Sequence, residues 1–396
     1  MMKNLFIFWD EPLNLTGGGI HRTISCLIEN LPSRGFDVYY ICTQDLYTTF
    51  TITKNHIEEC KVDRDGLIHY LRYKKTGIIL GQDPAHSEIL TRFVKNLNLD
   101  NYKLINQYHL TLLYYSIKLN WDFLKYSWRT QPNLHNRVDV ICKSLTYPLW
   151  RYMTNRKFNS IYSYNYENSD VTLLLSEYEK PILAKITNDA ELKKCEVIPN
   201  PLSWNEIASP EVLKTKKKEV LIVSRIYNIE KRIDLSLRVW KLLQEKGELN
   251  GWILRIVGDG VDKPNLMELS KKLHLENVVW EGRQDPRKFY KDASIFMLTS
   301  INEGWALTLT ESQQNGVVPI AFDSYPAVRS IISNGHDGFI VPSKDIHAMA
   351  NKLLLLMQDN EKREKMAMNA LIRCTRFTID KVMDQWAEML NKLSIR

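Results

Sequence analysis

The sequence predicts an α/β protein of two domains, each built around a parallel β-sheet. Three observations lead to this prediction. The chain has 396 residues, which exceeds the usual size of a single hydrophobic core. The first 43 residues read as strand, glycine loop, helix and strand, a unit that produces neighbouring parallel strands. A second alternating series of strands and helices begins near residue 219.

The first half alternates short apolar runs with amphipathic segments. LFIFW (5–9) is short, apolar and aromatic, which favours a buried strand. The segment after Gly17, Gly18 and Gly19 is amphipathic with helical spacing and ends near Gly35. The elements predicted in this half are the strand 5–9, the helix 20–35, the strands 37–43 and 77–80, a helix near 86–97, and the strands 103–107, 171–176 and 196–200.

Residues 201–218 separate the two halves. They contain two prolines and the basic run KTKKK (214–218), which predicts a solvated linker. The second half then repeats the alternation without a clear sequence repeat. Its predicted elements are the strands 219–226, 251–260, 277–282, 294–299, 317–322 and 338–342, helices between them that include 231–246, and a closing helix over 379–394.

The composition is that of an ordinary globular protein, with 44% hydrophobic and 25% charged residues. The net charge of +7 permits an acidic partner but does not require one. The six cysteines are scattered and form no CxxC pair, which disfavours a disulfide framework and a metal cluster and fits a reducing compartment. MMKNLFIFWDEP has an acid soon after its apolar run, so we interpret it as a strand and not as a signal peptide. No uncharged apolar run reaches the length of about 18 residues that predicts a membrane-spanning helix.

The stretch SINEGWALTLTESQQ (300–314) places Glu303 and Glu311 on either side of a glycine and an apolar run. SIFMLT (294–299) has the pattern of a buried strand, and the segment after the glycine has helical composition. Gly304 allows an unusual backbone angle between them. Ligands bind at the carboxyl ends of parallel strands, and helix amino termini attract anions, so the pair predicts a ligand site. Two solvated surface glutamates are the alternative.

Several further motifs occur in a fixed order: GGGIHRTISCLIENLPSRGFDVYYI, EVIPNPL, LIVSRIYNIEKRID, RIVGDG, EGR, NEGWALTLTESQQNGVVPIAF and NGHDGFIVP. With them the chain resembles the family-4 retaining glycosyltransferases, most strongly over 196–356 and also over the first 45 residues. The resemblance implies the α/β GT-B fold, in which two Rossmann-like domains face each other across a cleft and the C-terminal helix packs back towards the first domain. It further implies an acceptor-side domain over 1–200 with the helix 379–396, and a donor-binding domain over 201–378.

The resemblance also implies roles for individual residues. Arg225 and Lys231 match the cations that hold the donor diphosphate, where fixed positive charge stabilises the leaving group. A solvated basic pair is the alternative, and Lys231 is chosen over the adjacent Arg232 by alignment alone. Glu303 matches a contact to the hydroxyls of the donor sugar, and Glu311 a contact to the ribose hydroxyls. The other donor contacts implied after the first glutamate are Gly304, Trp305, Ala306, Leu307 and Thr308.

His109 matches a family histidine that reaches the donor sugar or diphosphate, with a satisfied structural histidine as the alternative. His86 is a second candidate in a loop. Trp305 stands where the family commonly has phenylalanine, and we expect it to narrow the site. The remaining implied contacts are Gly18 and Gly19 in the first glycine loop, Gly258 in the GDG turn, and Gly282 and Arg283 where backbone groups meet the base.

Asp63-Arg64-Asp65 is a DxD motif, which binds metal and nucleotide in another glycosyltransferase fold. Here the motif lies in the polar stretch VDRDG without a strong strand before it, and we interpret it as a turn. The resemblance implies no metal and no cofactor, only a nucleotide-sugar co-substrate, which is a UDP- or GDP-sugar.

Residues 115–160 interleave aromatic and basic side chains, a composition that suits an anionic membrane surface. Amphipathic helices with basic outer faces are the alternative. We expect no nucleic-acid partner because no recognition motif accompanies the patch. The side chains concerned are Trp121, Phe123, Tyr126, Trp128, Tyr147, Trp150, Tyr152, Phe158, Lys118, Lys125, Arg129, Arg137, Lys143, Arg151, Arg156 and Lys157.

The resemblance implies a metal-independent, retaining glycosyltransferase of hexosyltransferase type, acting on a saccharide or lipid-linked acceptor in bacterial surface polysaccharide or glycolipid synthesis. We expect it in the cytoplasm or peripherally on the inner face of the cell membrane. Two alternatives stay open: a nucleotide-sugar epimerase or hydrolase of the same fold, and a non-catalytic nucleotide-sugar-binding or membrane-scaffold protein. The intact set of Glu303, Glu311, Arg225 and Lys231 argues against the second.

Overall fold

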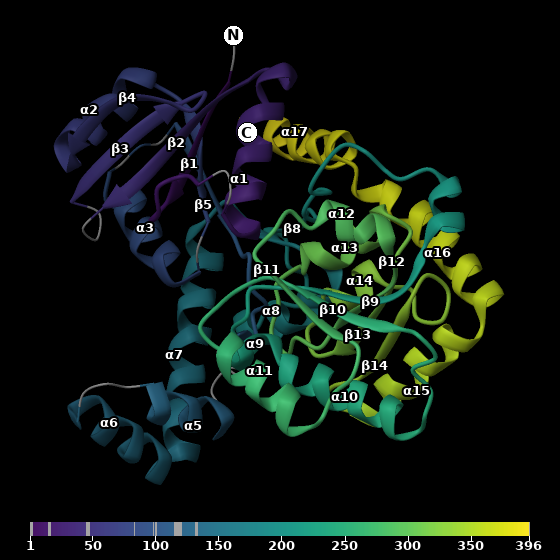
Figure 1. Ribbon diagram of the computed structural model, residues 1–396. Coiled ribbons are helices and arrows are strands. Elements are labelled where there is room, and N and C mark those ends of the chain that lie inside the picture. The colour runs from purple at the N-terminus through teal and green to yellow at the C-terminus, as the bar shows by residue number, and fades with distance from the viewer. Residues whose placement is uncertain are drawn as a thin grey trace. The chain divides into compact units, whose positions relative to one another are not determined.

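The computed structural model describes residues 3–14, 17–44, 48–82, 84–97, 99, 101–114, 121–130 and 134–395. The chain forms two compact units and passes between them several times. Each unit has its own β-sheet (Figure 1). The first unit comprises Met1–Leu112, Thr154–Pro201 and Phe377–Arg396, and the second Leu113–Met153 and Leu202–Arg376.

Within the described residues, the sheet of the first unit has the strand order β4-β3-β2-β1-β5-β6-β7-β8. The six neighbouring strands β2, β1, β5, β6, β7 and β8 pair in parallel. Strands β3 and β4 extend the sheet beyond β2 in antiparallel pairing. Continuous apolar runs form the central strands because helices cover both of their faces. Its elements are β1 (Lys3–Trp9), α1 (Gly19–Asn30), η1 (Pro32–Arg34), β2 (Phe36–Gln44), β3 (Thr49–Lys54), β4 (Ile57–Asp63), α2 (Arg64–Lys74), β5 (Gly77–Gly81), α3 (Pro84–Asn96), β6 (Tyr102–Gln107), β7 (Val171–Leu174), η2 (Glu177–Glu179), α8 (Lys180–Thr187), β8 (Cys195–Val197) and α17 (Ile379–Ile395).

The sheet of the second unit is parallel throughout its described strands, in the order β11-β10-β9-β12-β13-β14. Valine, isoleucine and leucine side chains of these strands form one core with α10, α15 and α16. Its elements from residue 202 onward are η3 (Pro210–Thr215), β9 (Lys217–Val223), α9 (Asn228–Lys231), α10 (Ile233–Glu245), β10 (Ile253–Val257), α11 (Lys263–Lys272), β11 (Val278–Gly282), α12 (Arg287–Asp292), β12 (Ala293–Leu298), α13 (Leu307–Gln314), β13 (Val318–Asp323), α14 (Val328–Ile331), β14 (Phe339–Pro342), α15 (Ile346–Gln358) and α16 (Asn360–Cys374), followed by η4 (Thr375–Phe377).

The C-terminal helix α17 packs on the first unit, as predicted. Val382, Met383 and Trp386 of this helix are buried in the same core as the inner face of α1. The two helices lie side by side in Figure 1, although they stand at opposite ends of the chain. The end of the chain therefore completes the hydrophobic core of its beginning.

Three helices occupy most of the stretch in which aromatic and basic side chains alternate. They are α5 (Trp121–Thr130), α6 (Leu134–Leu145) and α7 (Tyr147–Asn168). Residues 115–120 and 131–133, with Lys118 among them, lie outside the described residues. Of the helices that the described residues form, none combines the length and the apolar character that crossing a membrane requires.

The interpretation of the DxD motif at residues 63–65 as a turn is wrong. β4 ends at Asp63, and α2 begins at the next residue. Asp63 is the N-cap of this helix, and its Oδ1 accepts a hydrogen bond from Gly66 N at 2.8 Å. Strand β4 was not predicted because it is an edge strand with mostly exposed side chains and therefore lacks an apolar run. Within the described part of the chain, no three His, Cys, Asp or Glu side chains are grouped where they could hold a metal ion.

The prediction of a solvated linker over 201–218 is wrong for much of this segment. Gln314 Nε2 donates to the carbonyl oxygens of Trp204 at 2.5 Å and Glu206 at 2.6 Å, which fixes the segment against α13. Lys216 Nζ donates to two backbone carbonyl oxygens at 2.8 and 2.7 Å. Burial of this ammonium group lowers the pKa of Lys216 to about 7. Lys216 was interpreted as solvated because it lies in a basic run. Instead, its ammonium group donates hydrogen bonds to backbone carbonyl groups that are distant in sequence.

Candidate active site

The strand order of the second sheet reverses between β9 and β12, which pair in parallel. Strands β10 and β11 extend the sheet from β9, and β13 and β14 extend it from β12. In open parallel sheets, ligands bind outside the carboxyl ends of the strands at such a reversal. Arg225 follows β9 and Glu303 follows β12. The two loops at the reversal therefore carry two of the predicted site residues.

Lys231 and Glu303 form an ion pair in which Nζ and Oε1 lie 2.5 Å apart. Both side chains are largely shielded from water, so solvent and salt screen this pair less than a surface pair. The backbone also joins the two loops. The Lys231 carbonyl accepts a hydrogen bond from Thr299 Oγ1 at 3.1 Å, and the Glu230 carbonyl accepts one from Ile301 N at 2.9 Å. The end of α9 and the loop after β12 are thus held together.

Arg225 and Arg232 differ in how they are placed. The Arg225 side chain is 72% exposed, and its Nη2 lies 3.6 Å from Glu230 Oε2. Arg232 donates from Nε and Nη2 to the two oxygens of Asp234 at 2.9 and 3.0 Å. An exposed guanidinium can bind phosphate oxygens in bidentate fashion, whereas Arg232 already uses this geometry on a carboxylate. The contacts therefore favour Arg225 with Lys231, and not Arg232, as diphosphate-binding cations.

The GDG turn after β10 packs beneath the Arg225 loop. A Cβ atom at Gly258, whose φ is +142°, would lie 1.8 Å from the Ser224 carbonyl oxygen. A Cβ atom at Gly260 would lie 2.3 Å from the carbonyl oxygen of Ile226. No side chain fits at either position. The glycines of this turn are thus required by close backbone packing that supports Arg225.

Helix α13 begins shortly after Glu303 and contributes its first two residues to the predicted amide contacts. Ala306, at the N-cap, has a left-handed backbone with φ of +54°. The unusual backbone angle that was expected at Gly304 thus occurs at Ala306, because the chain turns into the helix at this residue. Alanine has no polar side chain to cap the first-turn amides, and such amides stabilise an anion. Trp305, which lies between Gly304 and Ala306 in the chain, has a buried side chain.

Glu311 is 1% exposed, and both of its oxygens accept hydrogen bonds from protein hydroxyls. Ser203 Oγ donates to Oε1 at 2.6 Å, and Tyr290 OH donates to Oε2 at 2.9 Å. Glu303, in the loop before α13, and Glu311, in α13, therefore have different partners: Lys231 pairs with Glu303, and two hydroxyl groups bind Glu311. Each carboxylate oxygen has two lone pairs, so Glu311 retains the capacity to accept from a ribose diol. The sequence interpretation missed Ser203, although it lies directly after the quoted EVIPNPL, and Tyr290, which no motif marks.

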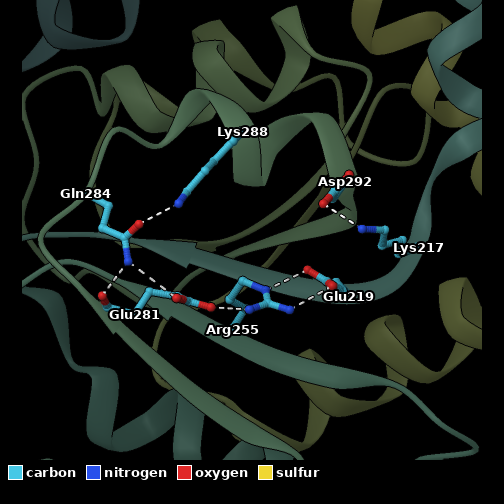
Figure 2. Close-up of polar contacts among 7 residues, drawn as sticks. All are labelled: Lys217, Glu219, Arg255, Glu281, Gln284, Lys288 and Asp292. Carbon is cyan, nitrogen blue, oxygen red and sulfur yellow. Dashed lines mark hydrogen bonds and ion pairs between the residues drawn. The ribbon is translucent and has the colours of Figure 1, made fainter.

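A polar network holds the loop at the end of β11, as Figure 2 shows. Arg255 donates to both oxygens of Glu219 at 2.8 and 2.9 Å and also pairs with Glu281. Gln284 Nε2 donates to the Glu281 carbonyl at 2.8 Å. The predicted base contact Arg283 lies between these two residues in the chain. The network therefore restrains the backbone on both sides of Arg283.

The first sheet also reverses its strand order, between β1 and β5. Gly18 is the N-cap of α1 and Gly19 is the first residue of this helix, and a Cβ atom at Gly18 would meet nothing within 4 Å. His109 follows β6, is buried and shares a hydrogen bond with Gln82, which follows β5 and had not been predicted. His86 falls in α3, and its side chain lies outside the described residues. His109 thus lies after the carboxyl end of a parallel strand and Gly18 at the start of α1, whereas the prediction of a loop at His86 is wrong because this residue lies in a helix.

Residues 205–373 match the protein family described as glycosyl transferases group 1. Among curated proteins, an uncharacterized glycosyltransferase of Haemophilus influenzae is 28% identical over 247 residues, which are 58% of this chain and 67% of that protein. The N-acetylgalactosamine-N,N'-diacetylbacillosaminyl-diphospho-undecaprenol 4-alpha-N-acetylgalactosaminyltransferase of Campylobacter jejuni is 25% identical over 387 residues, which are 93% of this chain and 94% of that enzyme. The match to the first three curated relatives spans 57 to 67% of their length.

Among solved structures, the pneumococcal O-GlcNAc transferase GtfA in complex with UDP and GlcNAc is similar to the chain with a TM-score of 0.71. The sequence identity is 11%, and the likeness covers 99% of both chains. At this identity the likeness concerns the fold. It confirms the predicted architecture of two Rossmann-like α/β domains.

Proposed function

We propose that the chain, which has the GT-B fold and matches the glycosyl transferases group 1 family over residues 205–373, transfers a sugar from a nucleotide sugar to a saccharide or lipid-linked acceptor with retention of anomeric configuration. The donor is a UDP- or GDP-sugar. Two similar proteins support these substrates: one curated relative is named for a diphospho-undecaprenol saccharide, and one solved structure is a complex with UDP and GlcNAc. The products of such a reaction belong to bacterial surface polysaccharide or glycolipid synthesis.

The observation that carries the proposal is the Lys231–Glu303 ion pair beside the exposed Arg225, at the strand reversal of the second sheet. Arg225 and Lys231 bind the diphosphate and stabilise the charge that it gains as the sugar leaves. Glu303 accepts hydrogen bonds from sugar hydroxyls, and Glu311 accepts them from the ribose.

The two predicted domains of the chain bind different substrates. Residues 201–378 bind the donor, and residues 1–200 with 379–396 bind the acceptor. His109 and the loop of Gly18 and Gly19 contact the reacting sugar. The leaving diphosphate takes the proton of the acceptor hydroxyl in a displacement on one face of the sugar, so no enzyme carboxylate acts as a nucleophile.

A panel of nucleotide sugars tests the proposal directly. We expect one UDP- or GDP-sugar to raise the melting temperature, because a ligand at 100 times its Kd adds about 2.7 kcal/mol to the free energy of unfolding. Mass analysis of the products with saccharide and lipid-linked acceptors should then show an acceptor longer by one sugar. A rearranged or hydrolysed donor would indicate an epimerase or hydrolase of the same fold. Binding without any turnover would indicate a non-catalytic protein.

We also propose that the helices α5 to α7 bind an anionic membrane surface. Among the described side chains of residues 121–153, eight large apolar ones are exposed, including Leu145 at 80%. Basic side chains that are also exposed, among them Lys125, Arg137 and Arg151, lie between them. Apolar side chains with nearby cations suit the headgroup region of anionic lipid. The eight apolar residues are Trp121, Trp128, Val138, Ile141, Leu145, Leu149, Tyr152 and Met153.

Co-sedimentation with vesicles tests this surface. We expect the chain to bind phosphatidylglycerol vesicles at low salt and to dissociate from them at high salt. It should not bind phosphatidylcholine vesicles. Replacing Leu145 and Leu149 with glutamate should reduce binding at least tenfold. Ile372→Glu is the matched control, since Ile372 is 64% exposed on α16, away from these helices in sequence. Absence of binding to anionic vesicles at low salt would overturn the membrane proposal.

A further inference from the structure

The hydroxyl of Tyr325 is buried in the second unit without a hydrogen-bond partner among the described residues. The residue is 3% exposed and follows β13, which pairs in parallel with β12. Glu303 follows β12. The two side chains thus come from loops after the carboxyl ends of adjacent strands, at the edge of the sheet where the donor is proposed to bind. The sequence interpretation assigned no role to Tyr325.

Asn302 is a second buried polar side chain of this kind. It is 5% exposed, and its Oδ1 has no hydrogen-bond partner in the described part of the chain. Its Nδ2 donates to the Tyr114 carbonyl oxygen at 3.5 Å, which orients the amide. Asn302 directly precedes Glu303 in the chain. Two unpaired polar atoms therefore accompany the carboxylate that is proposed to bind the sugar.

Buried polar atoms in proteins are nearly always hydrogen-bonded, and an unpaired one indicates a ligand or a bound water. Burial, together with the charge of Glu303, holds the pKa of the Tyr325 hydroxyl well above its ordinary value. The hydroxyl is therefore protonated and can both donate and accept a hydrogen bond. Asn302 Oδ1 and the Glu303 carboxylate can only accept. This combination fits a sugar, whose hydroxyls donate and accept in pairs.

We propose that Tyr325 and Asn302 bind hydroxyl groups of the donor sugar next to Glu303 and thereby determine which sugar the enzyme accepts. The inference rests on the proposed function and adds to it the residues that choose the sugar. A sugar that lacks the bonded hydroxyl, or carries it in the opposite configuration, leaves the buried Tyr325 hydroxyl unpaired and binds more weakly.

Tyr325→Phe tests this role because it removes only the hydroxyl. We expect the variant to bind the preferred nucleotide sugar about tenfold to a hundredfold more weakly, the range expected for one buried hydrogen bond. Its affinity for the corresponding nucleoside diphosphate, which has no sugar, should stay unchanged. The ratio of kcat/KM between the preferred donor and a deoxy analogue that lacks the bonded hydroxyl should fall towards one.

Tyr102→Phe is the matched control. It also removes a buried phenol hydroxyl, but that hydroxyl donates to the Leu71 carbonyl oxygen at 2.6 Å in the first unit. We expect it to lower the melting temperature and to leave donor discrimination unchanged. Tyr325→Phe should keep or raise the melting temperature, because it removes an unpaired polar atom from the interior.

The outcomes separate this inference from the proposed function. Equal affinity of Tyr325→Phe and the parent protein for the nucleotide sugar would overturn the inference. A melting temperature lowered as in Tyr102→Phe, with donor discrimination intact, would also overturn it, because the hydroxyl would then be held by water. A parent protein that binds no nucleotide sugar in the panel would overturn the proposed function and this inference with it.

Discussion

Replacing Glu303 with glutamine is expected to lower kcat by about 10²- to 10³-fold, the range measured when one electrostatic contact to a transition state is removed. The substitution keeps the size of the side chain and one hydrogen-bond acceptor towards Lys231, whose Nζ now lies 2.5 Å from Oε1. It removes the negative charge that balances the Lys231 ammonium group and that is proposed to bind the sugar hydroxyls. The measurement is initial-rate kinetics at saturating donor, with circular dichroism and thermal melting to verify the fold.

The free energy of unfolding should fall by only about 1–2 kcal/mol, because glutamine still accepts a hydrogen bond from Lys231. Glu268→Gln is the matched control in the same unit, since Glu268 pairs with Lys272 at 2.6 Å on the exposed face of α11. We expect that change to leave kcat unaltered, as exposed ion pairs contribute little. A kcat of Glu303→Gln within threefold of the parent value would contradict the assigned role. Activity that survives Glu303→Ala combined with Arg225→Ala would remove the basis for the glycosyltransferase assignment.

The sequence predicted best what depends on neighbours in the chain. The strand, loop and helix around Glu303 and Glu311 could be predicted because apolar runs, a glycine and helical composition follow one another within 21 residues, 294 to 314. Ser203 and Tyr290 could not be predicted as partners of Glu311. They are separated from it by 108 and 21 positions, and no spacing rule connects a hydroxyl with a carboxylate over such intervals. Only the folded sheet brings the three side chains together.

Polar residues were harder to predict than apolar ones for a related reason. Lys216 was predicted to be solvated because it lies in a basic run, yet its ammonium group donates hydrogen bonds to carbonyl groups of distant segments. The DxD motif was interpreted as a turn because the edge strand before it, β4, has no apolar face that would predict a strand. Tyr325 was assigned no role because its burial and its unpaired hydroxyl exist only in the folded structure. In each case the role of a polar group depends on what surrounds it, and composition does not contain that information.

Replacing Gly258 with alanine is expected to have the largest effect on stability, at about 3–5 kcal/mol of unfolding free energy. The added Cβ atom would lie 1.8 Å from the Ser224 carbonyl oxygen, so one of the two backbone segments must move. The φ of +142° adds strain, since residues with a side chain rarely adopt it. Urea unfolding measures the loss of stability. One of these segments contains Ser224, directly before Arg225, so we expect the KM for the donor to rise as well.

Gly251→Ala separates this effect from the general cost of replacing a glycine at positive φ. Gly251 lies before β10 in the same unit with φ of +81°, and a Cβ atom there would meet nothing within 4 Å. Its replacement should cost only about 1 kcal/mol and leave the donor KM unchanged. If the two alanine variants lost equal stability, backbone strain alone would explain both, and the close packing of the GDG turn under Arg225 would have no energetic role. If Gly258→Ala lost stability but bound the donor as tightly as the parent protein, the proposed binding of the diphosphate by Arg225 would not depend on this turn.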